Sequence, residues 1–464
     1  MTWFERLGGL DAAFLYLEDR SVHMHVGSVL VFEGPPPAER ELLALVGSRL
    51  HGVPRYRQRL AFPAFGAGRP VWVDDAEFDL EDHVRHTALP APGDEEQLRK
   101  LAGRLLGQRL DRDRPLWEIW FVDGLEGGHF GIIAKTHHCM IDGLSGVDLA
   151  GAVLDTTADA PPSEATPWVP RPVPDSATLV VRSLLDQLGH PIDVVRGALD
   201  ASSTARQAFL ELAGGMKPLL GLSRMGRAPE SSLNQPIGPH RRLELVSLDL
   251  ATVKRVRAAL GGTVNDVLLA VVTGGLRVLL QARGEEPRAD LRAMVPVSVR
   301  SADDRGAMGN RVTAIFCPLP VGEPDPVARL RRLTRETQGL KGSRQAVGAL
   351  ALVRLGELAP PALAAQASRL EMMTRFMNVV VTNVPGPQVP LYLLGRELLA
   401  WYPVVPLART QTVGIALLSY DGRIGIGLLG DAERARDLPT LARALPKALS
   451  ELVTAAGSAT ASRR

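Results

Sequence analysis

The spacing of apolar residues along this chain predicts alternating strands and amphipathic helices. Short runs with continuous or alternating apolar residues predict strands; they lie at 21–33, 117–123, 129–138, 291–301, 310–320, 378–387 and 411–431. Apolar residues at helical spacing predict helices; they lie at 38–52, 95–110, 144–155 and 248–284. Gly261 and Gly262 divide the last of these into two helices, because glycine commonly ends a helix.

One supersecondary pattern occurs in both halves of the chain. Residues 117–143 and residues 412–430 each read as a strand, an Asp-Gly turn and a second strand, with a helix following. Only the first copy carries histidines. This repetition predicts two related lobes, of which the N-terminal one bears the chemistry.

A proline-rich stretch separates the two copies. Residues 155–175 combine proline with small polar residues, which is typical of a linker. We therefore expect four regions, which are an N-terminal lobe at 1–154, a linker and helical connection at 155–232, a C-terminal lobe at 233–454, and a disordered tail at 455–464.

The composition narrows the class of protein. With 45% hydrophobic and 22% charged residues, the 464-residue chain has the balance of a soluble globular protein. A net charge of +2 does not call for nucleic acid. Two cysteines, Cys139 and Cys317, fit a reducing cytosol better than a disulfide framework. We expect no secretory signal and no membrane-spanning helix, so any membrane contact is expected to be peripheral.

The stretch KTHHCMIDG, at residues 135–143, is the densest group of side chains that can bind a metal or act in catalysis. Histidine, cysteine and aspartate are all metal ligands. However, neighbouring residues on a strand point to opposite faces, so His137 and His138 do not easily share one ion. His23 and His25 share a face but provide too few ligands for a site. We therefore expect no metal.

Two other interpretations of this stretch remain. His137 and His138 can be ordinary core residues at a strand end, with Asp142 and Gly143 forming a turn before a helix. Alternatively, one imidazole is a general base, which histidine supplies near neutral pH. Strand alternation places His138 on the uncharged face with Phe130 and His137 on the face with Lys135, which favours His138 as the base.

The same stretch, HHCMIDG, matches the HHxxxDG motif of acyltransferases with the chloramphenicol acetyltransferase fold. Further segments resemble one family within that group, the bacterial wax ester synthase/diacylglycerol acyltransferases (WS/DGAT). These segments are LDAAFLYLED, MHVG, DRPLWEIWFVDGL, LNQPIGPHRRL, GGTVNDVLLAVVTGGLR, VPVSVR, MGNRV and NVVVTNVPGPQVPLYLLG. The resemblance covers nearly the whole chain. It implies an α/β fold of two chloramphenicol acetyltransferase-like lobes, each a mixed sheet covered by helices, with a tunnel between them.

The resemblance also implies a reaction. A long-chain acyl group moves from acyl-CoA, as co-substrate without a further cofactor, to diacylglycerol or a fatty alcohol. His138 would deprotonate the acceptor hydroxyl, and His137 would support it. Attack would be direct, so Cys139 would not be a nucleophile. The alternatives are an acyltransferase of the same fold that uses a carrier protein, and a catalytically silent lipid-binding protein.

Other site residues follow from the family motifs. Asp142 is expected to pair with Arg300, and Gly143 to allow a close backbone turn. Asn265 is expected near the developing oxyanion, whereas Asp266 is either a substrate contact or the N3 residue of a capping box with Thr263. Pro115, Leu116 and Trp117 line the acyl pocket or are simply core.

The substrates imply contact with a lipid phase, at the inner face of the membrane or at lipid droplets. Residues 206–227 are either an interfacial segment or an ordinary packed helix. Residues 329–344 hold six basic residues and one acid. They either attract CoA or lipid phosphates, or form a solvated helix face.

Overall fold

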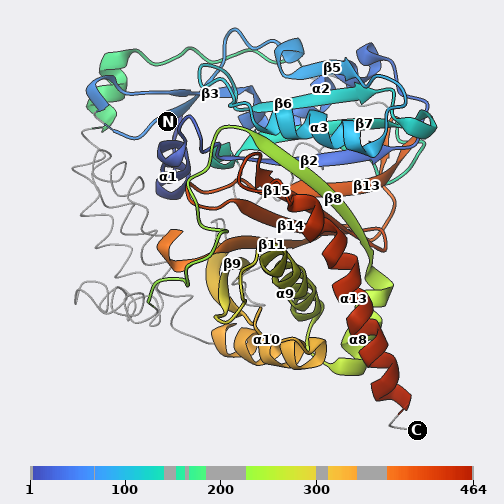
Figure 1. Ribbon diagram of the computed structural model, residues 1–464. Coiled ribbons are helices and arrows are strands. Elements are labelled where there is room, and N and C mark those ends of the chain that lie inside the picture. Colours follow the sequence, from blue (N-terminus) through green and yellow to red (C-terminus); the bar gives the residue numbers. More distant parts are fainter. Residues whose placement is uncertain are drawn as a thin grey trace, which may run out of the picture.

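The structure is a computed structural model in which residues 4–66, 68–140, 153–161, 167–183, 226–298, 312–341 and 374–461 are described (Figure 1). Two six-stranded mixed sheets form the two lobes, and a small sheet of order β1-β4-β3 lies at one edge. The lobes of the α/β fold predicted from the sequence are therefore present. The tunnel between them stays a prediction.

The N-terminal lobe is built on the sheet β12-β13-β2-β7-β6-β5. Its strands are β2 (His25–Phe32), β5 (Val84–Ala88), β6 (Trp117–Asp123), β7 (Phe130–His137), β12 (Tyr392–Leu393) and β13 (Arg396–Val404). Its helices are α1 (Gly9–Leu17), α2 (Glu39–Arg49) and α3 (Glu95–Leu106), and the small sheet consists of β1 (Glu5–Arg6), β3 (Gln58–Ala61) and β4 (Val71–Asp74). The expected hairpin at 117–138 is confirmed as the antiparallel pair of β6 and β7.

Strand β7 lies in the middle of this sheet and is buried along its whole length. Phe130, Ile132 and Ala134 face one apolar core, whereas Ile133 faces a second core together with leucines of α3. A strand covered on both sides reads as a continuous apolar run, which explains its sequence FGIIA. The strand is therefore a rigid support for the histidines at its end.

The C-terminal lobe is built on the sheet β10-β9-β11-β14-β15-β8. Its strands are β8 (Arg241–Asp249), β9 (Leu291–Ser298), β10 (Val312–Leu319), β11 (Val379–Pro385), β14 (Val413–Tyr420) and β15 (Arg423–Asp431). Its helices are α8 (Leu250–Leu260), α9 (Val264–Ala282), α10 (Pro326–Lys341) and α13 (Leu438–Ala461). Both the second hairpin, β14 and β15, and the division into α8 and α9 are as predicted.

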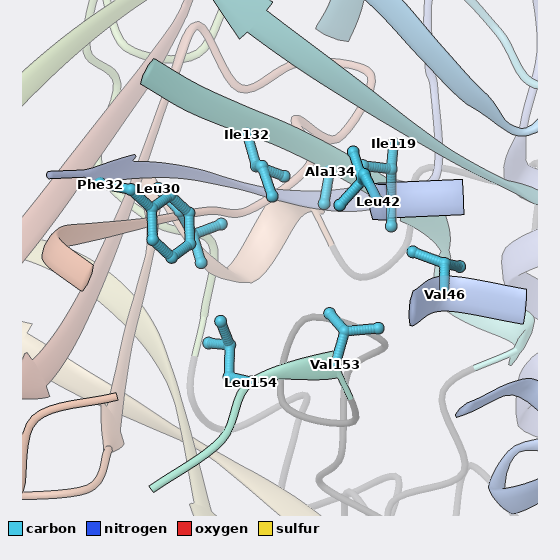
Figure 2. Close-up of a pocket in the computed structure, with 9 residues that line it drawn as sticks. All are labelled: Leu30, Phe32, Leu42, Val46, Ile119, Ile132, Ala134, Val153 and Leu154. Carbon is cyan, nitrogen blue, oxygen red and sulfur yellow. The ribbon is translucent and has the colours of Figure 1, made fainter. Parts of the chain in front are cut away.

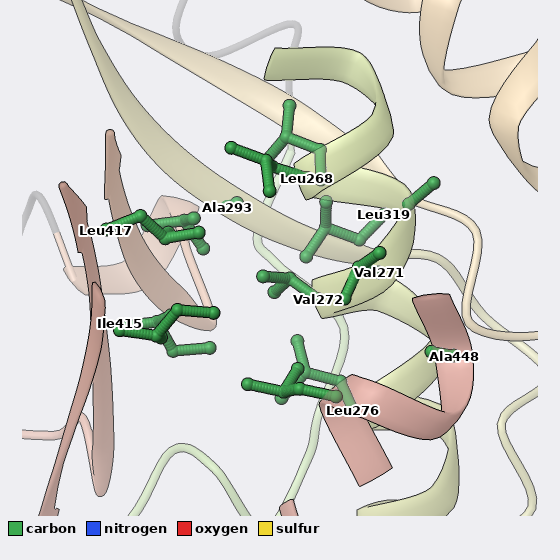
Figure 3. Close-up of a cluster of buried hydrophobic side chains, with 14 of the residues drawn as sticks. Leu268, Val271, Val272, Leu276, Ala293, Leu319, Ile415, Leu417 and Ala448 are labelled. Carbon is green, nitrogen blue, oxygen red and sulfur yellow. The ribbon is translucent and has the colours of Figure 1, made fainter. Parts of the chain in front are cut away.

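Helix α9 is the centre of the C-terminal core (Figure 3). It is long and apolar enough to cross a membrane by length and composition, but 72% of that stretch is buried inside the protein. A Cβ on Gly274 would lie 2.9 Å from Cβ of Ala448, and one on Gly275 would lie 2.7 Å from Cδ2 of Leu445. The two glycines thus let α13 pack closely on α9, as in a soluble core helix.

The lobes are interlocked, which the sequence boundary at residue 233 did not predict. Strand β13 comes from the C-terminal half yet pairs with β2 in the N-terminal sheet. There it crosses β15 closely, and a Cβ on Gly425 or Gly427 would lie 1.9 Å from the carbonyl oxygen of Trp401 or Pro403, respectively. The expected C-terminal lobe at 233–454 therefore donates residues 392–404 to its neighbour.

The expected disordered tail is wrong for most of its length. Helix α13 continues to Ala461, beyond the boundary at residue 454. The tail lacks apolar spacing, but Leu452 and Ala456 are buried, and alanine has the highest helix propensity. A helix already anchored by its earlier turns needs little more to continue.

Candidate active site

The two histidines lie where β7 ends. His137 is its last residue, and His138 begins a single 3-10 turn, His138–Met140. The N–H of His137 donates to the carbonyl of Leu116 at 2.9 Å, and the N–H of His138 donates to the carbonyl of Met24 at 2.7 Å. Strand alternation therefore does not fix the direction of His138, and the sequence argument that placed it on the face of Phe130 does not apply to this residue.

His138 has an apolar environment. Its ring stacks on Phe14 of α1 with the centroids 4.0 Å apart. Its Nδ1 is buried and finds no hydrogen-bond partner on another described residue. Burial lowers the pKa of His138 to about 4, and a contact with its own backbone opposes this only in part. The imidazole is consequently neutral near pH 7, which is the form that a general base requires.

His137 lies against a buried carboxylate. It is fully buried, and its Nε2 lies 3.2 Å from Oε2 of Glu18, at ion-pair distance but outside hydrogen-bond geometry. Its Nδ1 accepts the N–H of Cys139 at 3.1 Å and lies 2.9 Å from the sulfur of that residue. Arg112 donates to the same Glu18 oxygen at 2.9 Å. His137 thus fixes the turn that carries His138, as a supporting residue would.

Glu18 and Arg112 are functional candidates that the sequence did not single out. Burial alone would raise the pKa of Glu18, but its interactions with His137 and Arg112 outweigh this effect and lower that pKa to about 2. Glu18 is one of three acids in the segment LDAAFLYLED, so the family motif contained this residue without indicating its contact with His137.

Lys135 continues this buried polar face of β7, as its alternation with His137 predicts. Its Nζ lies 3.1 Å from Oε2 of Glu118 and donates to the carbonyls of Leu105 and Gln108. His25, on the neighbouring strand, is within 2.9 Å of the carbonyl of Leu106. These contacts lie at or just beyond the C-terminal end of α3, where helix carbonyls have no partner within the regular hydrogen-bond pattern of the helix.

Cys139 does not resemble a nucleophile. Its side chain is buried, and burial raises the pKa of its thiol well above the ordinary value. A thiol rather than a thiolate is a poor nucleophile and a poor metal ligand. Within the described ranges, no group of three or more histidine, cysteine or acidic side chains is placed to hold a metal ion.

Pro115, Leu116 and Trp117 lie directly beside the histidines but are buried in the N-terminal core. The indole of Trp117 donates to the carbonyl of Tyr56 at 2.8 Å and stacks on His83 at 4.6 Å. Their burial agrees with the core interpretation, and their expected place beside an acyl pocket stays a prediction. Leu116 supports the site through its backbone, because its carbonyl accepts the N–H of His137.

A small apolar void lies on the same face of the sheet as Trp117 (Figure 2). Its lining is entirely aliphatic or aromatic and consists of Leu30, Phe32, Leu42, Val46, Ile119, Ile132, Ala134, Val153 and Leu154. Its volume of about 10 Å³ is that of one water-sized sphere. The described residues therefore leave no room here for an acyl chain, and the acyl pocket stays a prediction.

Asp266 forms the cap that the capping-box interpretation predicted, and its expected contact with substrate stays a prediction. One of its oxygens accepts the N–H of Thr263 at 2.8 Å and the other accepts the hydroxyl of Thr337 at 2.7 Å. The side chain is buried, and Thr263 completes the capping box by accepting the N–H of Asp266. Asp266 therefore fixes the start of α9.

Asn265 is placed differently from Asp266. It is partly exposed, and its side-chain oxygen accepts a hydrogen bond at 3.1 Å from Asn383 of β11. An asparagine whose oxygen is used in this way presents its amide nitrogen as a donor. Its proposed role beside an oxyanion stays a prediction.

Several expected site residues lie outside the described residues. Asp142, Gly143 and Arg300 are among them, as is nearly all of the possible interfacial segment at 206–227.

Two arginines of the basic stretch at 329–344 make contacts within the protein. Arg329 is buried and donates to the carbonyl of Glu323, and Arg332 pairs with Asp290. That stretch is therefore less free to attract phosphates than its composition indicates.

Comparison with known proteins agrees with this geometry. The chain matches the model of the wax ester synthase/diacylglycerol acyltransferase catalytic domain over residues 7–268 and that of the WS/DGAT C-terminal domain over residues 308–453. Two Mycobacterium tuberculosis proteins described as probable diacylglycerol O-acyltransferases are similar to it. One is 36% identical over 96% of this chain and 95% of its own, and the other is 34% identical over 96% and 98%.

Solved structures give the same family. The wax ester synthase/diacylglycerol acyltransferase from Marinobacter aquaeolei VT8 has a TM-score of 0.69 and 27% identity, over 97% of this chain and 99% of that one. The first condensation domain of the calcium-dependent antibiotic synthetase shares the fold, with a TM-score of 0.62 and 17% identity over 97% of both chains. The chain thus belongs to the wax ester synthase/diacylglycerol acyltransferase family, whose HHxxxDG histidines are His137 and His138.

Proposed function

We propose that this protein moves a long-chain acyl group from acyl-CoA to the free hydroxyl of diacylglycerol, which yields triacylglycerol, and that fatty alcohols are a second class of acceptor. The observation that carries the proposal is the neutral imidazole of His138 at the end of a rigid strand. The names of the related mycobacterial proteins support diacylglycerol as the main acceptor.

The proposed reaction is a single displacement at the thioester. Nε2 of His138 takes the proton of the acceptor hydroxyl while the oxygen attacks the thioester carbonyl carbon. The tetrahedral intermediate then collapses, the C–S bond breaks, and His138 returns the proton to the leaving CoA thiolate. Asn265 is a candidate donor to the negative oxygen of that intermediate. The reaction needs no acyl-enzyme, in line with the protonated and buried thiol of Cys139.

No cofactor enters this scheme, in which acyl-CoA is a co-substrate. Both acceptors are nearly insoluble in water, so the enzyme has to meet them at a lipid surface. We place it in the cytoplasm, in peripheral contact with the inner face of the membrane or with lipid droplets.

The lowered pKa of His138 predicts an unusual pH profile. Burial favours the neutral ring, so His138 remains able to accept a proton down to about pH 4. We expect kcat/KM to fall on the acid side near that pH, whereas an unperturbed histidine would give a fall near about 6.5. Initial rates across this range test the point, with enzyme returned to neutral pH as the control for acid unfolding. An acid limb near the ordinary histidine value would contradict it.

The function itself is tested with purified protein and radiolabelled palmitoyl-CoA, given diacylglycerol or hexadecanol in separate reactions. We expect labelled triacylglycerol from the first and a smaller yield of wax ester from the second. If no labelled product formed with either acceptor, the proposal would be refuted, and a carrier-dependent acyltransferase or a silent lipid-binding protein would be favoured. A larger yield of wax ester would retain acyl transfer but reverse the order of acceptors.

A further inference from the structure

The hairpin of β3 and β4 displays two aromatic side chains to solvent. The strands pair up to Ala61 and Val71, and Phe62 and Phe65 lie in the connection between them. Phe62 is half-exposed and Phe65 is fully exposed. They are the only aromatic side chains among the large hydrophobic residues that are exposed in the described part of the chain. We call this pair the aromatic tip.

The backbone beneath the aromatic tip is fixed. Pro63, Gly68 and Pro70 are buried, and the carbonyl of Pro70 accepts the N–H of Leu7 at 2.9 Å. A Cβ on Gly68 would lie 2.5 Å from Oγ of Ser183, so the helical segment 176–183 packs directly against the loop. The buried residues on both sides of the aromatic tip therefore hold it in place, and β3 leads to it at the edge of the N-terminal lobe (Figure 1).

The exposed position of Phe65 is unfavourable for the isolated protein in two ways. Its φ is 58°, in the left-handed region that a bulky side chain rarely adopts and that asparagine or glycine would tolerate. Its ring is also left in water, although a polar residue would be better solvated there. Both costs would be offset if the aromatic tip is buried in something outside the molecule.

Arginines accompany the aromatic tip. Residues 55–69 contain four arginines and no acidic residue. Arg55 pairs with Glu5 of β1, and Arg59 pairs with Asp75, which follows β4. Over the whole edge, formed by residues 4–6, 55–75 and 167–183, seven arginines still face only four acids. Aromatic rings within a cationic surface match the boundary between anionic headgroups and acyl chains.

The edge is also close to the site. Strand β1 of the small sheet ends at Arg6, and α1 begins at Gly9. Phe14 of that helix stacks on His138. Since α1 is only about 14 Å long at 1.5 Å per residue, a lipid surface held by the tip would lie near the catalytic histidine.

We propose that the aromatic tip, Phe62 and Phe65 with the surrounding arginines, docks this enzyme on an anionic lipid surface and inserts both rings at the headgroup boundary. The inference deepens the proposed function, because it gives that function its route to water-insoluble acceptors. It assigns lipid contact to a segment other than 206–227 or 329–344.

The test is sedimentation of the full-length protein with vesicles of phosphatidylcholine containing phosphatidylglycerol, and with vesicles of phosphatidylcholine alone. The variant Phe62→Ser/Phe65→Asn removes both rings, and asparagine suits the positive φ, so the melting temperature should not fall. Val278→Ser, which removes an exposed apolar side chain from α9, is the matched control. We expect the double variant to bind anionic vesicles about tenfold more weakly or worse, and the control to bind like wild type.

Two results would overturn the proposal. One is a double variant that binds anionic vesicles as tightly as wild type. The other is a wild-type protein that does not prefer anionic vesicles to neutral ones, or whose binding is unaffected by salt, because the arginines would then have no part in it. Vesicle binding needs no turnover, so a failure of the acyltransferase assay would not be mistaken for a failure of docking.

Discussion

Replacing His138 with alanine is expected to lower kcat by about 10²–10⁴-fold, the range that a positioned general base contributes. The neutral ring of His138 is the group placed to take the acceptor proton, and water would have to replace it. The substitution should leave the fold intact. It removes a buried Nδ1 that has no partner on another described residue, which offsets the lost stacking on Phe14.

The measurement compares initial rates of labelled triacylglycerol formation by wild type, His138→Ala and His240→Ala at equal concentration. His240 is exposed, and its described hydrogen bonds are made by its backbone carbonyl, so its side chain provides a matched control. Melting temperatures of all three proteins separate loss of catalysis from loss of fold. Undiminished turnover by His138→Ala would overturn the assignment of the base while leaving the proposed reaction in place.

The local structure around the site could be predicted from the sequence because it depends on neighbours in the chain. Alternating apolar residues with an intervening turn specify the hairpin that ends in His137. Thr263 and Asp266 specify the start of α9 in the same way, since a capping box needs only residues three apart. The structure contains this capping box, with both oxygens of Asp266 accepting hydrogen bonds.

The interlocking of the lobes could not be predicted in this way. The sequence of β13 has the apolar content of an ordinary strand. No pattern in the neighbouring residues predicts that it pairs with β2 of the other half. The glycines that permit its crossing, Gly425 and Gly427, read in the sequence as ordinary strand glycines. Partner choice between strands is a tertiary property, so it emerges only when both lobes are assembled.

Glu18 was missed for a related reason. A glutamate just after an amphipathic helix is normally exposed, because burying a carboxylate is unfavourable without a partner. Its partners, Arg112 and His137, are about one hundred residues away in the chain. Only the folded arrangement brings the three side chains together, so no local pattern in the sequence predicts the contact.

Glu18→Gln is expected to lower the free energy of unfolding by about 3 kcal/mol at neutral pH. The substitution keeps the shape of the side chain but leaves the buried His137 and the partly exposed Arg112 without their carboxylate. Breaking a buried pair typically costs about 3–5 kcal/mol, and the partial exposure of Arg112 places the expected cost at the lower end. The lowered pKa of Glu18 gives a similar magnitude for the loss in the free energy of unfolding. A shift from 4.5 to about 2 corresponds to roughly 3 kcal/mol at about 1.4 kcal/mol per pH unit.

The pH dependence distinguishes this mechanism from a general loss of packing. Because the folded pKa of Glu18 lies below its unfolded value, its contribution is fully present above about pH 4.5 and disappears as the pH falls towards 2. Urea unfolding of wild type and Glu18→Gln should therefore show a large difference at pH 7 that shrinks below about 4.5. Glu96→Gln, which breaks an exposed pair with Lys100 on α3, should show no measurable difference at either pH. A difference for Glu18→Gln that stays constant with pH would mean that the charge on Glu18 does not hold His137 in place.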